Sequence, residues 1–291
     1  MKILNDIQLN ELCRNIAQET NYNLYDFVLY KDGQSFRYVH QSANMCNDSY
    51  SVSKVFTMTA VGMLVDEGKI SLDDRITDIL ADEISASPAP GWEKVTVAHA
   101  LCHKMGVRGM YLDIDSDDVR AYPSRDYLSL VLSRKLAYEP GSKYGYSDAA
   151  YYLASRVVSK ITGQILDAYL TEKLFRPIDF AEMAWSKCPY GYAMGATGLY
   201  CRTEDMLKLA VLYMDDGVWE GKRYVSSQWV KTALEQQFDW YPSTTAYQKG
   251  GAFGQCIAFD TESRQAIAFH AFQDQPSQFA DRVFAEILCK K

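Results

Sequence analysis

Ser51 and Lys54 are the residues of this chain whose types and spacing most directly suggest covalent chemistry. Residues three apart on a helix lie on one face, so the hydroxyl and the amine can meet. A serine hydroxyl is a weak nucleophile that needs a base, and a neutral lysine can serve. Burial and the positive end of a helix dipole disfavour the ammonium form, and the free N–H of Ser51 at the helix start can donate to an oxyanion. About one S-x-x-K pair is expected by chance in a chain of this length, so the setting must decide.

The segment after Ser51 predicts a helix that is buried on nearly every side. Its apolar and small residues recur at spacings of three and four: Val52, Val55, Phe56, Thr59, Ala60, Met63 and Leu64. Lys54 is the only charge before Asp66, and Gly68 suits the end of the helix. Because burying a lysine without partners is costly, we expect Lys54 to face a polar site or to pair with another group.

Tyr146 is a further candidate, in the segment "EPGSKYGYSDAAYYLAS". A Pro-Gly turn precedes it, and Ser147 or Asp148 can cap a helix that begins near Ala149. The phenol would then lie on a loop just before that helix, where it can face a cleft. Packing is the competing interpretation, because the chain has 21 tyrosines.

Lys249, Gly250 and Gly251 form another cluster, ahead of an expected strand. Glycines there can let a ligand approach the backbone closely. A hairpin turn explains them equally well.

Two hairpins, one near each terminus, are the elements that must position these groups. Residues 23–41 predict two strands around a turn at 31–33, and residues 250–272 predict two strands around a turn at 260–264. The residues from about 51 to 234 are mostly helical or loop. A final helix is indicated by the spacing of Phe279, Val283, Phe284 and Ile287.

This order of elements predicts an α+β fold. An antiparallel sheet is built from both termini and flanked by helices, and a mostly helical domain is inserted between its halves. We assign residues 1–60 and 236–291 to the sheet domain and residues 61–235 to the helical domain, with the active site at the seam.

Composition excludes several classes of protein. The net charge of −7 argues against a nucleic-acid partner, which usually demands a basic face. No apolar run reaches the length of a membrane span. The first residues, "MKILNDIQLNELCRN", carry polar and acidic groups where a signal peptide has an apolar core, so we expect a cytoplasmic protein.

Neither a disulfide framework nor a metal site is indicated, and we expect no cofactor. The seven cysteines (13, 46, 102, 188, 201, 256 and 289) are odd in number and irregularly spaced, which favours reduced, mostly buried thiols. His99 and His103 are four apart, but without a third ligand we expect them to pack or to cap a helix.

The three clusters, in this order, resemble the S-x-x-K, Y-x-N and K-T-G motifs of the serine β-lactamase and penicillin-binding-protein superfamily. The class C branch, which includes related esterases, is the more similar one. The segments between the motifs are similar as well: "LVDEGKISLDDRITDIL", "VTVAHALCHKMGV", "PGSKYGYSD", "ATGLYCRTEDMLKLA", "YVSSQWV" and "GAFGQCIAF". The likeness is collinear from about residue 51 to residue 259.

The resemblance implies a role for each matching residue. Ser51 would be the acylated nucleophile, Lys54 its base or proton relay, and Tyr146 a partner in the acid/base work. The substrate-binding and oxyanion side would be formed by Asp148, Lys249, Gly251 and Ala252. Within it, Lys249 would bind a substrate carboxylate or tune the electrostatics, and the N–H groups of Ser51 and Ala252 would form the oxyanion hole.

Three departures from the pattern weaken the case for β-lactam hydrolysis. Asp148 replaces the usual Asn. An ionised carboxylate only accepts hydrogen bonds, whereas the amide of Asn can also donate them, and the carboxylate can hold Lys54 protonated. Lys249-Gly250-Gly251 lacks the hydroxyl of K-T-G, and "LCHKMG" replaces "LTHTSG".

Three hypotheses follow. The leading one is a serine hydrolase that cleaves a small-molecule ester or amide through an acyl-Ser51 intermediate. The second is a β-lactamase or D-alanyl-D-alanine peptidase, and the third is a catalytically weak member of the fold that binds a ligand. The lack of a G-x-S-x-G motif argues against a conventional α/β-hydrolase. The oligomeric state is left open.

Overall fold

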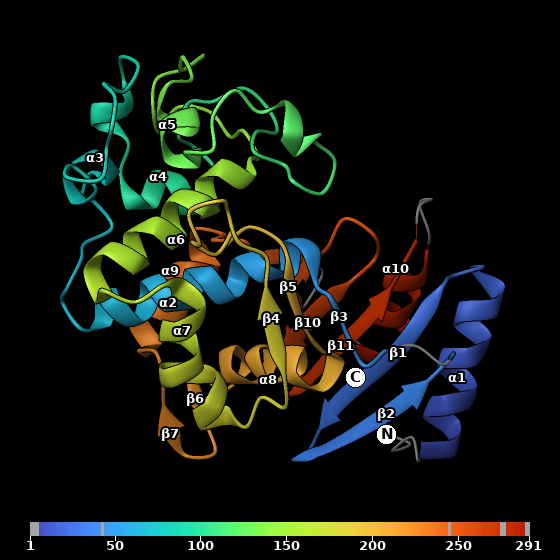
Figure 1. Ribbon diagram of the computed structural model, residues 1–291. Coiled ribbons are helices and arrows are strands. Elements are labelled where there is room, and N and C mark those ends of the chain that lie inside the picture. Colours follow the sequence, from blue (N-terminus) through green and yellow to red (C-terminus); the bar gives the residue numbers. More distant parts are fainter. Residues whose placement is uncertain (1–5, 42–43, 244–245, 274–277, 289–291) are drawn as a thin grey trace.

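A six-stranded antiparallel sheet forms one side of the molecule, and helices and loops form the other (Figure 1). The computed structural model describes residues 6–41, 44–243, 246–273 and 278–288. The strands are β1 Leu24–Lys31, β2 Gln34–Val39, β3 Cys46–Asp48, β4 Met183–Trp185, β5 Leu199–Arg202, β6 Val218–Trp219, β7 Lys222–Arg223, β8 Tyr241–Ser243, β9 Ala246–Gly250, β10 Cys256–Asp260 and β11 Gln265–Ala271.

Helices account for most of the middle of the chain. The α-helices are α1 Asp6–Glu19, α2 Ser53–Asp66, α3 Ile76–Ile79, α4 Val97–Leu101, α5 Tyr127–Leu132, α6 Asp148–Thr162, α7 Leu166–Leu170, α8 Thr203–Met214, α9 Ser227–Glu235 and α10 Phe279–Val283. Short 3-10 or π-helical turns are η1 Tyr50–Val52, η2 Trp92–Lys94, η3 Val119–Ala121, η4 Thr171–Phe175, η5 Arg176–Ile178 and η6 Phe284–Leu288.

The large sheet is built from both ends of the chain, as the sequence predicts. Its order is β2-β1-β11-β10-β9-β8, so the N-terminal hairpin pairs directly with the C-terminal one. β1 and β11 are antiparallel, with Phe27 opposite Phe269. Both predicted hairpins are confirmed, because β2 follows β1 after two residues and β11 follows β10 after four. The α+β fold is therefore confirmed.

The two faces of the sheet are covered by different helices (Figure 1). Along β1, Phe27 and Leu29 join an apolar cluster with α1 and α10, while Val28 joins the main core on the opposite face. This alternation follows from the two-residue period of a strand. On the main-core face α8 packs against β1, β10 and β11.

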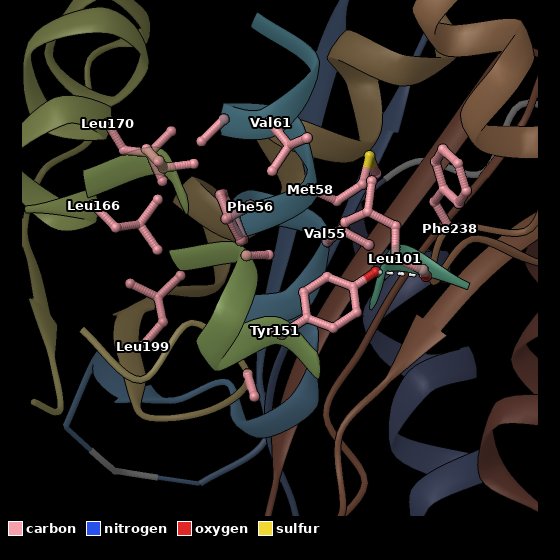
Figure 2. Packing of buried hydrophobic residues seen from close by; sticks show 14 of the residues in the cluster. Val55, Phe56, Met58, Val61, Leu101, Tyr151, Leu166, Leu170, Leu199 and Phe238 are labelled. Atoms are coloured by element: carbon pink, nitrogen blue, oxygen red, sulfur yellow. Dashed lines mark hydrogen bonds between the residues drawn. The ribbon is translucent and has the colours of Figure 1, made fainter. Parts of the chain in front are cut away.

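The predicted buried helix is α2. Every residue from Ser53 to Leu64 is buried, and Gly68 has the left-handed φ of 66° that is common just past a helix end. Figure 2 shows apolar side chains of α2 between α7 on one side and Leu101 and Tyr151 on the other. A lysine on such a helix has no route to solvent.

Short strands in the middle of the chain were not predicted. β3, β5 and β4 form a three-stranded sheet, and β6 pairs with β7. Strands of two to four residues carry too little periodicity to be recognised in a sequence. β3 matters for the site, because it ties the segment just before Ser51 to β5.

The domain boundaries stay a prediction. One feature bears on them: α8 packs on the large sheet although it lies within the range assigned to the helical domain. The six described cysteines have free thiols, and Cys289 lies outside the described residues. No helix in the described ranges is both long and apolar enough to cross a membrane.

Candidate active site

Ser51 lies in the 3-10 turn η1, which leads directly into α2. The turn is held on both sides. Asp48 Oδ1 accepts the Tyr50 N–H at 2.8 Å, and the N–H and Oγ of Ser49 both donate to the Leu199 carbonyl, at 2.9 and 2.7 Å. Tyr50 has a left-handed φ of 46°, a conformation that costs an ordinary residue roughly 1–2 kcal/mol. The contacts around it offset that cost and fix the start of the helix at which Ser51 is presented.

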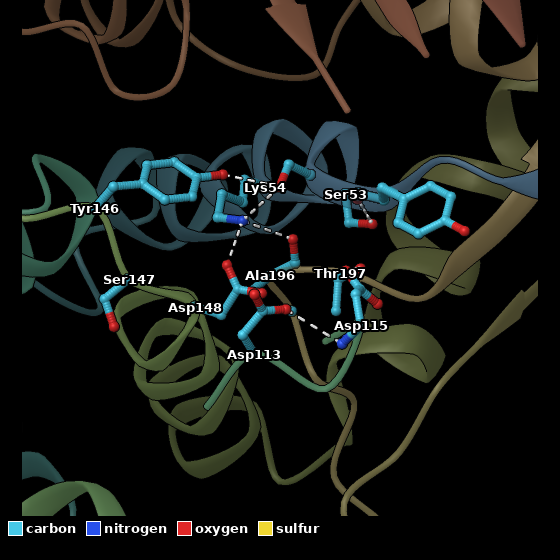
Figure 3. Close-up of polar contacts among 12 residues, drawn as sticks. Ser53, Lys54, Asp113, Asp115, Tyr146, Ser147, Asp148, Ala196 and Thr197 are labelled. Atoms are coloured by element: carbon cyan, nitrogen blue, oxygen red, sulfur yellow. Dashed lines mark hydrogen bonds and ion pairs between the residues drawn. The ribbon is translucent and has the colours of Figure 1, made fainter. Parts of the chain in front are cut away.

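Lys54 is fully buried and uses three hydrogen bonds. Its Nζ donates to Ser51 Oγ at 3.0 Å, to Asp148 Oδ1 at 2.8 Å and to the Ala196 carbonyl at 2.9 Å (Figure 3). Burial by itself lowers the pKa of Lys54. The Asp148 carboxylate, Tyr146 and Asp239 together outweigh that effect, Asp148 contributing most among them, and raise the pKa above its ordinary value. The expected partner of the buried lysine is therefore Asp148, and the amine is an ammonium.

Tyr146 precedes α6, and its phenol reaches the nucleophile. Its Oη donates to Ser51 Oγ at 2.8 Å, and Lys54 Nζ lies 4.7 Å from the centre of its ring. Ser147 is the N-cap residue of α6, one of the two candidates from the sequence, although its side chain makes no capping hydrogen bond. The loop position predicted for Tyr146 is confirmed.

Asp148 opens α6 and is 2% exposed. An acidic residue in the first turn of a helix is favoured by the helix dipole, and the ion pair with Lys54 adds to this. The residue that departs from the family pattern thus faces the nucleophile's lysine directly.

Lys249, Gly251 and Ala252 reach the same site from the β9–β10 hairpin. Lys249 lies in β9, and Gly251 and Ala252 lie in the turn that follows. A Cβ on Gly251 would lie 2.9 Å from the Ser49 carbonyl oxygen and 2.6 Å from Gln255 Oε1. Glycine is therefore required here for the hairpin turn to approach the segment that carries Ser51.

Asp239 and His103 belong to the site but were not predicted as site residues. Asp239 is fully buried, and its carboxylate binds Lys249 Nζ and His103 Nε2. The sequence did contain a signal for Asp239, which lies between Phe238 and Trp240. A charged residue between large aromatic residues is expected to be buried and therefore to form an ion pair. For His99, the expected capping role is confirmed by reciprocal hydrogen bonds with Thr96.

A cavity of about 410 Å³ opens beside Ser51. Its lining includes predicted site residues together with an acidic wall formed by Asp113 and Asp115. The lining residues are Ser51, Met110, Asp113, Asp115, Ser116, Tyr146, Asp148, Tyr241, Lys249, Gly250, Gly251, Ala252 and Phe253. Six of the seven residues predicted for the site line this cavity, and the seventh, Lys54, is buried behind Ser51 and donates to its Oγ.

Asp113 and Asp115, on the loop after α4, add negative charge to this cavity (Figure 3). Much of Asp115 is exposed, but its carboxyl group is partly desolvated, and this desolvation raises its pKa to about 6. The nearby carboxylates of Asp48, Asp148 and Asp113 add to the increase, and a hydrogen bond from Thr197 opposes it. Oxygens of Asp113, Asp115 and Asp148 lie within 4.8 Å of one another. We assign no metal to them, because the Lys54 ammonium already occupies Asp148.

Comparisons with known proteins agree with the fold. A relative from Escherichia coli strain K12, provisionally named a D-alanyl-D-alanine carboxypeptidase, is 30% identical over 168 residues, which cover 54% of this chain and 38% of the relative. The chain thus spans well under half of that relative's length. The crystal structure of a penicillin-binding protein from Bacillus halodurans is 18% identical with a TM-score of 0.72, over 95% of this chain and 99% of the other.

A class C β-lactamase structure is 15% identical with a TM-score of 0.69, over 94% of each chain. At these identities the two structures establish the fold alone. The fold is that of the penicillin-binding proteins and class C β-lactamases. The chain belongs to the Beta-lactamase family, whose model matches residues 27–289.

Proposed function

We propose that this protein cleaves an ester or amide through an acyl-Ser51 intermediate. One observation carries the proposal: Ser51 Oγ, at the edge of a cavity, accepts hydrogen bonds from both Lys54 Nζ and Tyr146 Oη, at 3.0 and 2.8 Å. A nucleophile in contact with groups that can move and stabilise charge is the arrangement that covalent catalysis needs.

In this mechanism Tyr146, rather than Lys54, takes the serine proton. The three N–H groups of the Lys54 ammonium are already donated, and its raised pKa keeps it protonated near neutral pH. The phenol, which donates to Ser51 Oγ in the resting site, must first lose its proton to solvent; Ser51 Oγ then attacks the substrate carbonyl, and its proton passes to the Tyr146 oxygen. The ammonium groups of Lys54 and Lys249, 4.7 and 5.1 Å from the ring centre, offset the negative charge on that oxygen.

Collapse of the tetrahedral intermediate breaks the bond to the leaving group, which receives the proton from Tyr146. Water then attacks the acyl-Ser51 carbonyl, gives its proton to Tyr146 and releases the acid, and the proton returns to Ser51. The N–H groups of Ser51 and Ala252 are the oxyanion donors in both halves of the reaction.

The charges around the cavity favour uncharged or cationic substrates over carboxylates. The Lys249 ammonium is paired with Asp239, so it is a weak receptor for a substrate carboxylate. Asp113 and Asp115 line the cavity and repel such a group. This charge distribution ranks an esterase or amidase above a β-lactamase or a D-alanyl-D-alanine peptidase. The name of the E. coli relative supports the peptidase alternative.

Labelling at Ser51 tests the proposal. The wild-type protein is incubated with a fluorophosphonate probe and with short p-nitrophenyl esters, and the labelled residue is identified by peptide mass spectrometry. Ser51→Ala should abolish labelling and turnover, whereas Ser71→Ala, at an exposed serine outside the cavity, should retain both. Labelling or turnover that survives in Ser51→Ala contradicts the proposal.

The same assay separates the alternatives. Faster hydrolysis of a chromogenic cephalosporin than of the esters would support a β-lactamase. No labelling of the wild-type protein would support a ligand-binding member of the fold. The cytoplasmic location stays a prediction, which cell fractionation with an antibody to the protein tests.

A further inference from the structure

Asp239 lies behind the catalytic cavity, in contact with two residues that both lead to Tyr146. It immediately precedes Trp240 and β8, has a side chain that is 0% exposed, and is absent from the cavity lining. Its Oδ1 accepts a hydrogen bond from Lys249 Nζ, and its Oδ2 lies 3.0 Å from His103 Nε2. Tyr241 Oη also donates to Oδ1, at 3.5 Å.

The first connection runs through Lys249. Its Nζ donates to Tyr146 Oη at 3.4 Å and lies 5.1 Å from the centre of the Tyr146 ring. The ammonium therefore has Asp239 on one side and the phenol on the other. Its position over the ring depends on the carboxylate that holds it.

The second connection runs through His103 to the backbone of the same loop. His103 Nδ1 accepts the Ser147 N–H at 3.3 Å, which leaves the imidazole proton on Nε2, where it is donated to Asp239. Burial lowers the pKa of His103 more than Asp239 raises it, so the ring stays neutral and keeps this tautomer. The imidazole also packs against Tyr146, with ring centres 4.4 Å apart.

Both connections depend on the charge of Asp239. Burial raises the pKa of its carboxyl group, but Lys249, His103 and Lys54 together lower it well below the ordinary value. The carboxylate is therefore ionised near neutral pH. Substitution of a charged group that orients a functional residue commonly lowers activity, although that group does not contact the substrate.

We propose that Asp239 is a positioning residue for Tyr146: through Lys249 it places a positive charge on the phenol, and through His103 it fixes the backbone that presents it. This inference rests on the proposed function, in which Tyr146 moves the proton of Ser51. Asp239 does not contact the substrate.

The test compares Asp239→Asn with Asp26→Asn as a matched control. Asp26 is also buried, pairs with Arg37 at 2.8 Å and is hydrogen-bonded by Thr203, but none of these residues lines the cavity. Acylation by p-nitrophenyl acetate is measured in the pre-steady state from pH 5 to pH 10. Rates are divided by the number of active sites, titrated with a fluorophosphonate, and thermal unfolding is recorded for each variant.

Asp239→Asn should lower the acylation rate per site by about tenfold to a hundredfold with little change in KM. The pH profile should change as well, because the negative charge that holds Lys249 and His103 is removed. Asp26→Asn should lower the unfolding temperature and leave the rate per site and the pH profile unchanged. An Asp239→Asn protein with the wild-type rate per site and pH profile overturns the inference.

Variants of His103 give a second test that does not depend on Asp239→Asn folding. His103→Gln keeps one donor for Asp239 and one acceptor for Ser147, so it should retain most of the rate. His103→Leu removes both and should lose about as much as Asp239→Asn. Equal rates per site in the two His103 variants contradict the inference, whereas absence of Ser51 labelling in the wild-type protein contradicts the proposed function itself.

Discussion

Lys54 Nζ lies 3.0 Å from Ser51 Oγ and 2.8 Å from Asp148 Oδ1, so one ammonium group joins the nucleophile to the carboxylate that replaces the family's amide. The pair is 0% and 2% exposed. Asp148 therefore decides whether the lysine next to the nucleophile can accept a proton. The behaviour of the site with pH should follow from this contact.

Asp148→Asn should raise the acylation rate near neutral pH. Without the carboxylate, the remaining effect of burial lowers the pKa of Lys54, and a neutral amine becomes available to take the Ser51 proton. The burst rate with p-nitrophenyl acetate at pH 7 measures the change. Asp205→Asn is the matched control, because Asp205 is also a buried carboxylate in a first helical turn, paired with Lys208. An unchanged or lower burst rate in Asp148→Asn counts against this role.

Lys54→Met should cost about 3–5 kcal/mol in the free energy of unfolding, because it leaves the Asp148 carboxylate buried without its partner. Urea denaturation measures this. The double variant Lys54→Met/Asp148→Leu should recover most of the loss. Lys160→Met, which breaks a surface pair with Asp82, should change stability by only about 0–1 kcal/mol. A similar small change for Lys54→Met would refute the buried-pair interpretation.

Gly251→Ala should impair both folding and acylation. Its Cβ would lie 2.9 Å from the Ser49 carbonyl, which belongs to the segment that presents the nucleophile. We expect a loss of about 1–3 kcal/mol in stability, with a larger fall in the acylation rate per folded molecule. Gly250→Ala is the stability control, because a Cβ there would have its nearest atom at 3.6 Å. Normal stability of Gly251→Ala would show that the hairpin turn can shift freely.

His270 should make the fold less stable in acid. Its Nδ1 hydrogen-bonds to Thr203 Oγ1 at 2.7 Å, and burial lowers its pKa to about 4. The unfolded chain binds a proton near pH 6.5 and the folded chain does not. Stability is therefore complete above pH 6.5 and is lost as the pH falls toward 4, by up to about 3 kcal/mol.

Urea denaturation at pH 7 and pH 4.5 measures this loss. His270→Gln should reduce it more than His40→Gln does, at a half-buried histidine whose pKa burial also lowers. A wild-type acid loss that persists unchanged in His270→Gln would assign the effect to other groups.

The charge preference for substrates should strengthen as the pH rises through about 6, the pKa of Asp115. Above that value the carboxylate is ionised, so the ratio of kcat/KM for a cationic ester to that for an anionic ester of the same size should increase. Asp115→Asn should flatten this dependence. Asp118→Asn is the control, since Asp118 is exposed and outside the cavity lining. A flat ratio in the wild-type protein would contradict the role of the acidic wall.

Much of the fold could be predicted from the sequence, because its elements have strong local signals. The two hairpins have alternating strands and turn residues, and α2 has a continuous apolar pattern that ends at Gly68. β3, β4 and β5 were missed because each has only three or four residues, and their pairing depends on contacts distant in the chain.

The candidate site divides in the same way. Ser51, Lys54 and Tyr146 were found through motif spacing, and the pairing of Lys54 with Asp148 through the cost of a buried charge. Asp239 and His103 are 136 residues apart, and no local pattern links them. Their contact arises only when the β8 side of the sheet meets the loop after α4.

The pairing of β1 with β11 has a consequence for the synthesis of this protein. Leu24 and Ala271 are partners in the sheet, so a ribosome must synthesise all the residues between them before β1 can pair with β11. The helices around Ser51 leave the ribosome before the β9–β10 hairpin, so the cavity is incomplete until that hairpin is synthesised. A nascent chain should therefore stay unreactive toward a fluorophosphonate until its last strands are released, and contacts between such distant segments form slowly.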